Sequence, residues 1–201
     1  MEYIKHLSKD KIMAGVLKNQ VPLKLVKRKN FFHHLCASII SQQLSVKVAR
    51  VIHDRYLTLF DGKEPIPEEV LKMPVEKLRS IGFSQAKATY VHNIAVFALE
   101  QGLDAKKLHK LHNEEIIEYL TQIKGVGRWT VEMQLMFTMG REDVFAIDDL
   151  GIQNAMIALY KIKTDDKKKL KAKLLKISEQ WAPYRTYACM HLWRWKDGEE
   201  L

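Results

Sequence analysis

Cysteine is nearly absent from this chain of 201 residues, which contains only Cys36 and Cys189. Two cysteines are too few for the disulfide framework of a small secreted domain, for a four-cysteine zinc site or for a cysteine-ligated iron–sulfur cluster. Both cysteines lie in apolar segments with helical spacing. We therefore expect two reduced, buried thiols that take no part in chemistry.

Long apolar runs are also missing. No segment reaches the roughly 20 residues that a membrane-spanning helix requires. The N-terminal residues Met1–His6 lack the apolar core of a signal peptide. We expect a soluble intracellular protein, in the cytoplasm or at the nucleoid, with no membrane partner.

The alternation of apolar and polar residues that marks a half-buried strand is a third absence. Apolar residues instead recur with the 3.6-residue period of a helix in nearly every segment. This pattern predicts an all-α fold of about ten helices joined by short loops. Two helical lobes are the expected arrangement, one from residues 1–44 and 146–201 and the other from residues 45–145. Residues with side chains suited to helix N-caps precede several of these segments, namely Ser8, Asn30, Ser45 and Ser84.

Positive charge is what the chain has in excess. Lysine and arginine number 33 against 24 acidic residues, which gives a formal net charge of +9. Such an excess favours a polyanionic partner, and nucleic acid is the obvious one. Eight lysines lie between Lys161 and Lys176. They form either a solvated helix face or a field that steers DNA toward the protein.

The most informative motif is a Gly-Val-Gly turn between two predicted helices, within residues 120–130. An ordinary left-handed helix C-cap needs one glycine, and here there are two, Gly125 and Gly127. Val126 is expected to point inward and hold the helices together. Lys124 and Arg128 flank the turn, and a helix N-terminus favours an anion. The turn therefore predicts a grip on a nucleic-acid phosphate, with a purely structural corner as the alternative.

A weaker copy of this turn lies earlier in the chain. Gly82 follows a short predicted helix, and Ser84 is placed to cap the next one. This segment is either a second hairpin that grips the DNA backbone or an ordinary corner between helices.

An acidic pair, Asp148-Asp149, precedes another predicted helix. We predict that Asp148 caps this helix and that Asp149 faces a cleft. A carboxylate at a helix start stays ionised, because the helix dipole favours the anion. Such a group can stabilise a developing positive charge or activate water. Capping alone is the alternative role for the pair.

Aromatic and amide side chains supply the remaining candidates. Trp129 and Trp193 could line a pocket in which an extruded base stacks. Gln42 and Gln43 lie at a junction between two predicted helices and could enter a DNA groove, although surface glutamines are the simpler interpretation.

Several motifs in one order give the chain a resemblance to the helix-hairpin-helix DNA glycosylases, and within them to the 3-methyladenine DNA glycosylase II branch. The resemblance runs from about residue 30 to residue 196. The matching segments are Ser41–Ser45, Ile81–Ala88, Ile123–Thr130, Val144–Gly151 and Trp181–Trp193.

This resemblance implies a two-lobed helical fold with a base pocket between the lobes. We expect the chain to lack the N-terminal β domain of some relatives, because only about 30 residues precede the first matching helix. The hairpin, with Lys124, Arg128 and Thr130, would hold the backbone of double-stranded DNA that contains damaged bases. The resemblance implies no cofactor and no metal beyond a monovalent cation on the carbonyls of the hairpin. A monomer is expected.

The resemblance also assigns the chemistry. Asp149 corresponds to the catalytic carboxylate, and Trp129 and Trp193 correspond to the pocket tryptophans. The plug that fills the gap left by a flipped base would be Gln42, Gln43 or Leu44. Bifunctional members carry a nucleophilic lysine where this chain has Trp129. A tryptophan cannot form a Schiff base, so hydrolysis without β-lyase activity is expected.

The predicted function is therefore excision of alkylated purines, such as 3-methyladenine and 7-methylguanine, at the start of base excision repair. Two alternatives stay open at this point. One is a glycosylase for deaminated or oxidised bases. The other is a helix-hairpin-helix module that binds DNA without catalysis.

Overall fold

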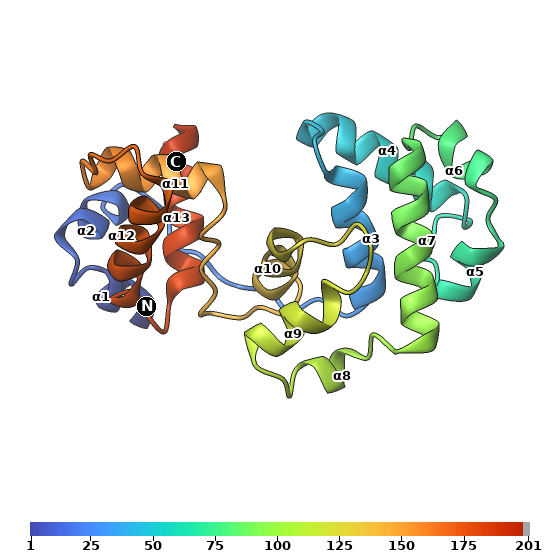
Figure 1. Cartoon of the computed structure of the whole chain (residues 1–201), viewed down its shortest axis with the longest axis horizontal. Helices are drawn as coiled ribbons and strands as arrows, with labels where there is room; N and C mark the ends of the chain where they lie inside the picture. The colour runs from blue at the N-terminus through green and yellow to red at the C-terminus, as the bar shows by residue number, and fades with distance from the viewer. Residues whose placement is uncertain (199–201) are drawn as a thin grey trace. The chain divides into compact units, whose positions relative to one another are not determined.

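The computed structural model describes residues 1–198, and over this range it contains thirteen helices and no strand (Figure 1). The predicted all-α fold is confirmed. The chain forms two compact units. The terminal unit combines Met1–Val26 with the segment that begins at Leu135, and the central unit is Lys27–Gln134.

The boundaries of these units differ from the predicted lobes, which divided the chain after residues 44 and 145. Helix α3 (Phe31–Ser41) packs against α4 (Val46–Thr58) and α7 (Gln85–Glu100), so it belongs to the central unit. The second boundary falls inside α10 (Arg128–Phe137). Charge and periodicity along the chain do not reveal which helices share a core, and this is why the division was misplaced.

The central unit is built around α7, which packs against α3, α5 and α6. Its helices begin where the sequence signals predict, because the side chains of Asn30, Ser45 and Ser84 each accept a hydrogen bond from a backbone N–H in the first turn. Large side chains that are fully buried form its core, among them Leu35, Ile39, Tyr56, Leu78, Ile94 and Ile116. Its remaining helices are α5 (Pro67–Lys72), α6 (Val75–Ser80), α8 (Ala105–Leu108) and α9 (Asn113–Leu120).

The terminal unit begins differently from the prediction. Ser8 does not cap a helix N-terminus, because it ends α1 (Glu2–Leu7). The cap of α2 (Lys11–Leu17) is Asp10, whose Oδ1 accepts hydrogen bonds from two N–H groups of the first turn. The helices that complete this unit are α11 (Leu150–Leu159), α12 (Lys167–Glu179) and α13 (Arg185–Asp197).

Asp10 also anchors the core of the terminal unit. Its Oδ2 accepts hydrogen bonds from Gln180 Nε2 at 3.0 Å and Trp181 Nε1 at 3.1 Å, and from the hydroxyl of Tyr160. Hydrogen bonds from several donors offset the cost of removing this carboxylate from water. Around this anchor α11 packs against α13, which brings the start of α11 close to Trp193.

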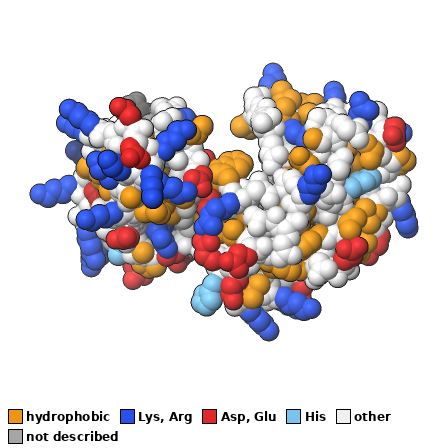
Figure 2. Space-filling view, in the orientation of Figure 1, with side chains coloured by type: hydrophobic (Ala, Val, Ile, Leu, Met, Phe, Trp, Pro, Cys, Tyr) orange, Lys and Arg blue, Asp and Glu red, His pale blue; other side chains and the backbone are white. Residues whose placement is uncertain are grey.

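The surface of the terminal unit is strongly basic. All eight lysines between Lys161 and Lys176 are exposed. Lysine and arginine side chains cover much of its visible face in Figure 2. The exposure of these lysines agrees with the solvated helix face that the sequence offered for this segment. Among the described residues, no helix is long and apolar enough to cross a membrane.

Candidate active site and nucleic-acid interface

Asp149 is the N-cap of α11, which corrects the prediction that Asp148 holds this position. Its Oδ1 accepts a hydrogen bond from the backbone N–H of Ile152 at 2.9 Å. The helix begins at Leu150, so the side chain directly before it is the one that reaches the first turn. Placing the helix start one residue too early exchanged the roles of the two aspartates.

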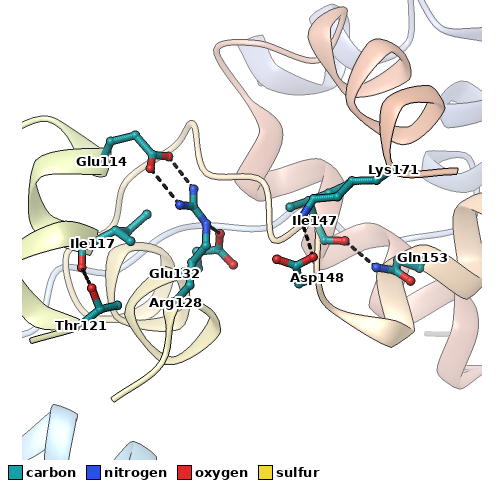
Figure 3. Close-up of polar contacts among 9 residues, drawn as sticks. All are labelled: Glu114, Ile117, Thr121, Arg128, Glu132, Ile147, Asp148, Gln153 and Lys171. Atoms are coloured by element: carbon teal, nitrogen blue, oxygen red, sulfur yellow. Dashed lines mark hydrogen bonds and ion pairs between the residues drawn. The ribbon is translucent and has the colours of Figure 1, made fainter. Parts of the chain in front are cut away.

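Asp148 is instead an exposed residue of the preceding turn. Its carboxylate forms an ion pair with Lys171 Nζ of α12, with an N–O distance of 2.8 Å (Figure 3). About half of each side chain is exposed, so the pair contributes little to stability. Its structural effect is to connect the lysine-rich helix to the turn that carries Asp149.

Trp193 of α13 holds the carboxylate of Asp149. The indole Nε1–H donates a hydrogen bond to Asp149 Oδ1 at 2.9 Å. The ring of Phe137 lies 6.0 Å from the Trp193 ring, measured between centroids. A methyl group on Gly151 would lie only 3.0 Å from Asp149 Oδ1 and 3.2 Å from Trp193 Cδ1, so the lack of a side chain there permits this contact.

This arrangement fixes a half-buried carboxylate at a helix N-terminus. The positive end of the helix dipole and two hydrogen-bond donors, the Ile152 N–H and the Trp193 indole N–H, face this carboxylate. A negative charge fixed in this way needs little reorganisation to stabilise a cationic transition state. The site is thus suited to hydrolysis of a bond whose carbon develops positive charge.

The first glycine of the Gly-Val-Gly turn is required by the fold. Gly125 has φ +104°, and an added Cβ would lie 2.2 Å from Cγ of Tyr90, on α7. Both the backbone conformation and the ring of Tyr90 therefore exclude a side chain. Val126 is 4% exposed, which confirms that it points into the protein.

The second glycine has no such requirement. Gly127 lies outside the left-handed region, and no described atom lies within 4 Å of the position that its Cβ would occupy. It is exposed and directly precedes α10, whose first N–H groups have no intrahelical partners. Open space at this helix N-terminus agrees with close approach by an anion.

The polar groups around the Gly-Val-Gly turn differ in whether they are available to bind a phosphate. The side chain of Lys124 is exposed, and its carbonyl accepts a hydrogen bond from Asn93 Nδ2 at 3.0 Å. Asn93 belongs to α7 and was not identified from the sequence. It fixes the turn on the same helix that contacts Gly125 through Tyr90.

Arg128 is engaged by carboxylates, which the sequence did not predict. Its Nη1 and Nη2 contact the two carboxylate oxygens of Glu114 at 2.9 and 2.5 Å, and its Nε contacts Glu132 Oε1 at 3.0 Å (Figure 3). The Glu132 side chain is only 2% exposed and needs a nearby cation. Hydrogen bonding to Arg128 lowers the pKa of Glu114. A phosphate would have to compete with these carboxylates for Arg128.

The earlier glycine turn has a similar backbone. Gly82 has φ +111° and is exposed, and Ser84 Oγ accepts the N–H of Lys87 at 3.2 Å to cap α7. An added Cβ at Gly82 would contact Ile52 Cδ1 at 3.4 Å, which is ordinary van der Waals contact. The left-handed φ therefore explains this glycine, and a contact with DNA stays a prediction.

The three candidate plug residues lie in the turn between α3 and α4. Gln42 Nε2 donates to the hydroxyl of Thr130 at 3.3 Å. Gln43 is exposed and has φ +58°, while Leu44 is half-buried. Thr130 is 3% exposed, so a phosphate contact at this residue would come from its backbone rather than its side chain.

The two candidate pocket tryptophans differ in setting. Trp129 belongs to the central unit and is 42% exposed. Trp193 belongs to the terminal unit and is bound to Asp149. Their meeting in one pocket stays a prediction. The described residues contain no group of three or more His, Cys, Asp or Glu that could hold a metal ion.

Comparison with known proteins adds independent evidence. Residues 36–180 match the family model described as HhH-GPD superfamily base excision DNA repair protein. DNA-3-methyladenine glycosylase 1 of Schizosaccharomyces pombe is 38% identical over 186 residues, which cover 92% of this chain and 80% of that protein.

Solved structures agree with this match. A 3-methyladenine DNA glycosylase of S. pombe in complex with abasic DNA has a TM-score of 0.87 and 34% identity, covering 100% of this chain and 99% of that one. A DNA-3-methyladenine glycosidase of Bacillus halodurans has a TM-score of 0.84 and 34% identity, covering 98% and 89%.

Proposed function

Because this chain belongs to the HhH-GPD superfamily of base excision DNA repair proteins, we propose that it is a DNA glycosylase that excises alkylated purines. The substrates are bases of the 3-methyladenine and 7-methylguanine type in double-stranded DNA. The protein initiates base excision repair by hydrolysing the bond between the damaged base and the sugar. The relatives named for 3-methyladenine support this choice of lesion over deaminated or oxidised bases.

The held carboxylate of Asp149 is the observation that carries this proposal. Alkylation at N3 or N7 places a positive charge on the purine, which makes the base a good leaving group without a strong general acid. As the bond breaks, the sugar develops oxocarbenium character. Asp149 stabilises this cation and assists the addition of water at C1′. A module that only binds DNA has no use for a carboxylate fixed by an indole N–H.

Hydrolysis without β-lyase activity follows from Trp129. This residue is the second of α10. Its side chain carries no amine that could attack the sugar. Its indole ring and that of Trp193 are suited to hold a flipped cationic base by stacking and cation–π attraction, worth about 0.5–2 kcal/mol for each contact.

The DNA backbone is gripped by the turn at Gly125 and Gly127 together with Lys124. Backbone N–H groups at the start of α10 face the phosphate. A monovalent cation would bind carbonyl oxygens of this turn. The Lys124 carbonyl already accepts a hydrogen bond from Asn93, and its second lone pair is the one that a cation would use. The protein acts on cellular DNA as a monomer.

Incubation with duplex DNA treated with dimethyl sulfate tests this proposal. Released bases are identified by chromatography, and strand breaks are counted before and after alkali. We expect free 3-methyladenine or 7-methylguanine, with breaks only after alkali. Breaks that depend on the enzyme without alkali would contradict monofunctional hydrolysis. Tight DNA binding without any base release, from alkylated, deaminated or oxidised DNA, would favour a binding module.

A further inference from the structure

The turn between α3 and α4 has a conformation that is unfavourable on its own. Gln43 adopts φ +58°, which costs a residue with a side chain roughly 1 kcal/mol or more. Two weak backbone hydrogen bonds stabilise the turn internally, Gln42 N–H to the Ile39 carbonyl at 3.3 Å and Leu44 N–H to the Ser41 carbonyl at 3.2 Å. Contacts from outside the turn must therefore keep it in this shape.

Lys87 supplies such contacts. Its Nζ donates hydrogen bonds to the carbonyls of Ile40 at 2.9 Å and Gln42 at 2.8 Å. These carbonyls belong to the last turn of α3 and its C-cap, where intrahelical partners run out and the helix dipole is negative. An ammonium group at this point satisfies both the hydrogen-bonding needs and the dipole of α3.

The position of Lys87 in its own helix is otherwise unfavourable. It lies in the first turn of α7, where the helix dipole disfavours a cation. Partial burial also lowers the pKa of its ammonium group. The hydrogen bonds of Lys87 to the two carbonyls must therefore offset the unfavourable helix dipole and the partial burial. We infer that the role of Lys87 lies in the turn between α3 and α4, which carries these carbonyls.

A second contact joins the turn to α10. Gln42 Nε2 donates to the hydroxyl of Thr130, which is buried in the first turns of α10. The turn is thus bound to two helices, α7 and α10. Each of these helices begins near an exposed glycine, Gly82 and Gly127, at which a contact with the DNA backbone is predicted.

We propose that Lys87 is a positioning residue that holds residues 42–44 in the shape needed for lesion recognition. This inference rests on the proposed function, because it assigns to that function the residue that prepares its plug. With the turn already ordered, insertion beside a flipped nucleotide loses less conformational entropy. Binding to intact duplex depends on the glycine turns and does not require the ordered segment.

The test compares affinity for two duplexes, one with a tetrahydrofuran abasic analogue and one intact. We expect Lys87→Met, similar in length but without a donor, to lower the preference for the abasic duplex about tenfold. Its affinity for intact duplex stays within about twofold of the wild type. Lys87→Arg, whose fork can reach two carbonyls, keeps most of the preference. A 2-aminopurine beside the analogue reports the same loss through its fluorescence.

Two results would overturn the positioning role. If Lys87 contacted a phosphate, both affinities would fall together and the slope of log K against log salt would drop by about 0.9. If Lys87 only stabilised the fold, the melting temperature would fall and the preference would not change. Should Lys87→Met fail to fold, Lys87→Gln, which keeps a donor for one carbonyl, replaces it and is expected to lose part of the preference.

Base release by the wild type is measured separately from these affinities. Suppose that the wild type releases damaged bases and that Lys87→Met keeps the full preference for the abasic duplex. This result would refute the positioning role and leave the proposed function standing. Suppose instead that the wild type releases no base but that its preference for the abasic duplex depends on Lys87. This result would refute the proposed reaction and leave the positioning role standing.

Discussion

At the scale of single residues, the assignment of the catalytic carboxylate depends on a one-residue difference. The sequence identified the acidic pair and favoured Asp149 for the site, but it gave the cap to Asp148. The structure gives the cap to Asp149 and pairs Asp148 with Lys171. The bond from Trp193 could not be predicted, because it joins residues 44 positions apart in the sequence.

The hydrogen bond between Trp193 and Asp149 can be removed while an aromatic ring is kept. A charge-assisted hydrogen bond contributes about 1.5–3 kcal/mol. Trp193→Phe should therefore lower the single-turnover rate of base excision by about tenfold or more, with little change in affinity for abasic duplex. The rate is measured with enzyme in excess over duplex that carries one 7-methylguanine.

Asp148→Asn is the matched control for this experiment. It alters the neighbouring carboxylate, which is about half exposed and paired only across the surface with Lys171. We expect its excision rate to stay within about twofold of the wild type, because exposed ion pairs contribute little. An equal loss in both variants would mean that the Trp193 contact has no particular role.

At the scale of elements, most helices and their caps follow from the sequence, and the exceptions have physical causes. Helix α8 (Ala105–Leu108) was missed because four residues are too few to show a period. Of the two partners of Arg128, Glu114 could not be predicted because it lies on another helix, α9, whereas Glu132 lies four residues further along α10 and its spacing was overlooked. The Gly-Val-Gly turn was recognised, although only Gly125 is required by the fold, whereas the role of Gly127 at the DNA stays a prediction.

Alanine substitutions at these two glycines are expected to have different effects, one on stability and the other on DNA affinity. Gly125→Ala places a methyl group against the ring of Tyr90 at positive φ, so we expect a loss of stability of about 2 kcal/mol or more. Gly127→Ala meets no described atom within 4 Å and should change the melting temperature little. Its methyl group instead obstructs the approach of a phosphate and lowers affinity for duplex DNA.

Thermal melts and DNA-binding titrations of the two variants check this contrast. Wild-type DNA affinity in Gly127→Ala would mean that the second glycine is not at the interface. Unchanged stability in Gly125→Ala would contradict the close contact with Tyr90.

At the scale of the whole molecule, the sequence predicted an all-helical DNA-binding protein correctly and divided it incorrectly. The net charge of +9 favoured a polyanionic partner without indicating which cations are available to it. Arg128 is compensated by two carboxylates, whereas the side chain of Lys124 is exposed. Side-chain pairing of this kind depends on the folded chain and cannot be read from composition.

The salt dependence of DNA binding separates these two cations. Lys124→Gln should reduce the slope of log K against log salt by about 0.9, because one phosphate contact is lost. Arg128→Gln should reduce the slope less and lower the melting temperature more, since buried Glu132 loses its ion pair. Equal slopes for both variants would show that Arg128 leaves Glu114 and contacts a phosphate in the complex.

Excision by Asp149→Asn tests the central claim most directly. Single-turnover release of 7-methylguanine is followed for the variant and the wild type, with spontaneous depurination subtracted. Asparagine is similar in size and can still accept the bonds from Ile152 and Trp193, but it removes the negative charge. We predict a loss of at least about a hundredfold in rate with affinity for abasic duplex retained. Release at the wild-type rate would contradict the assignment of Asp149 as the catalytic carboxylate.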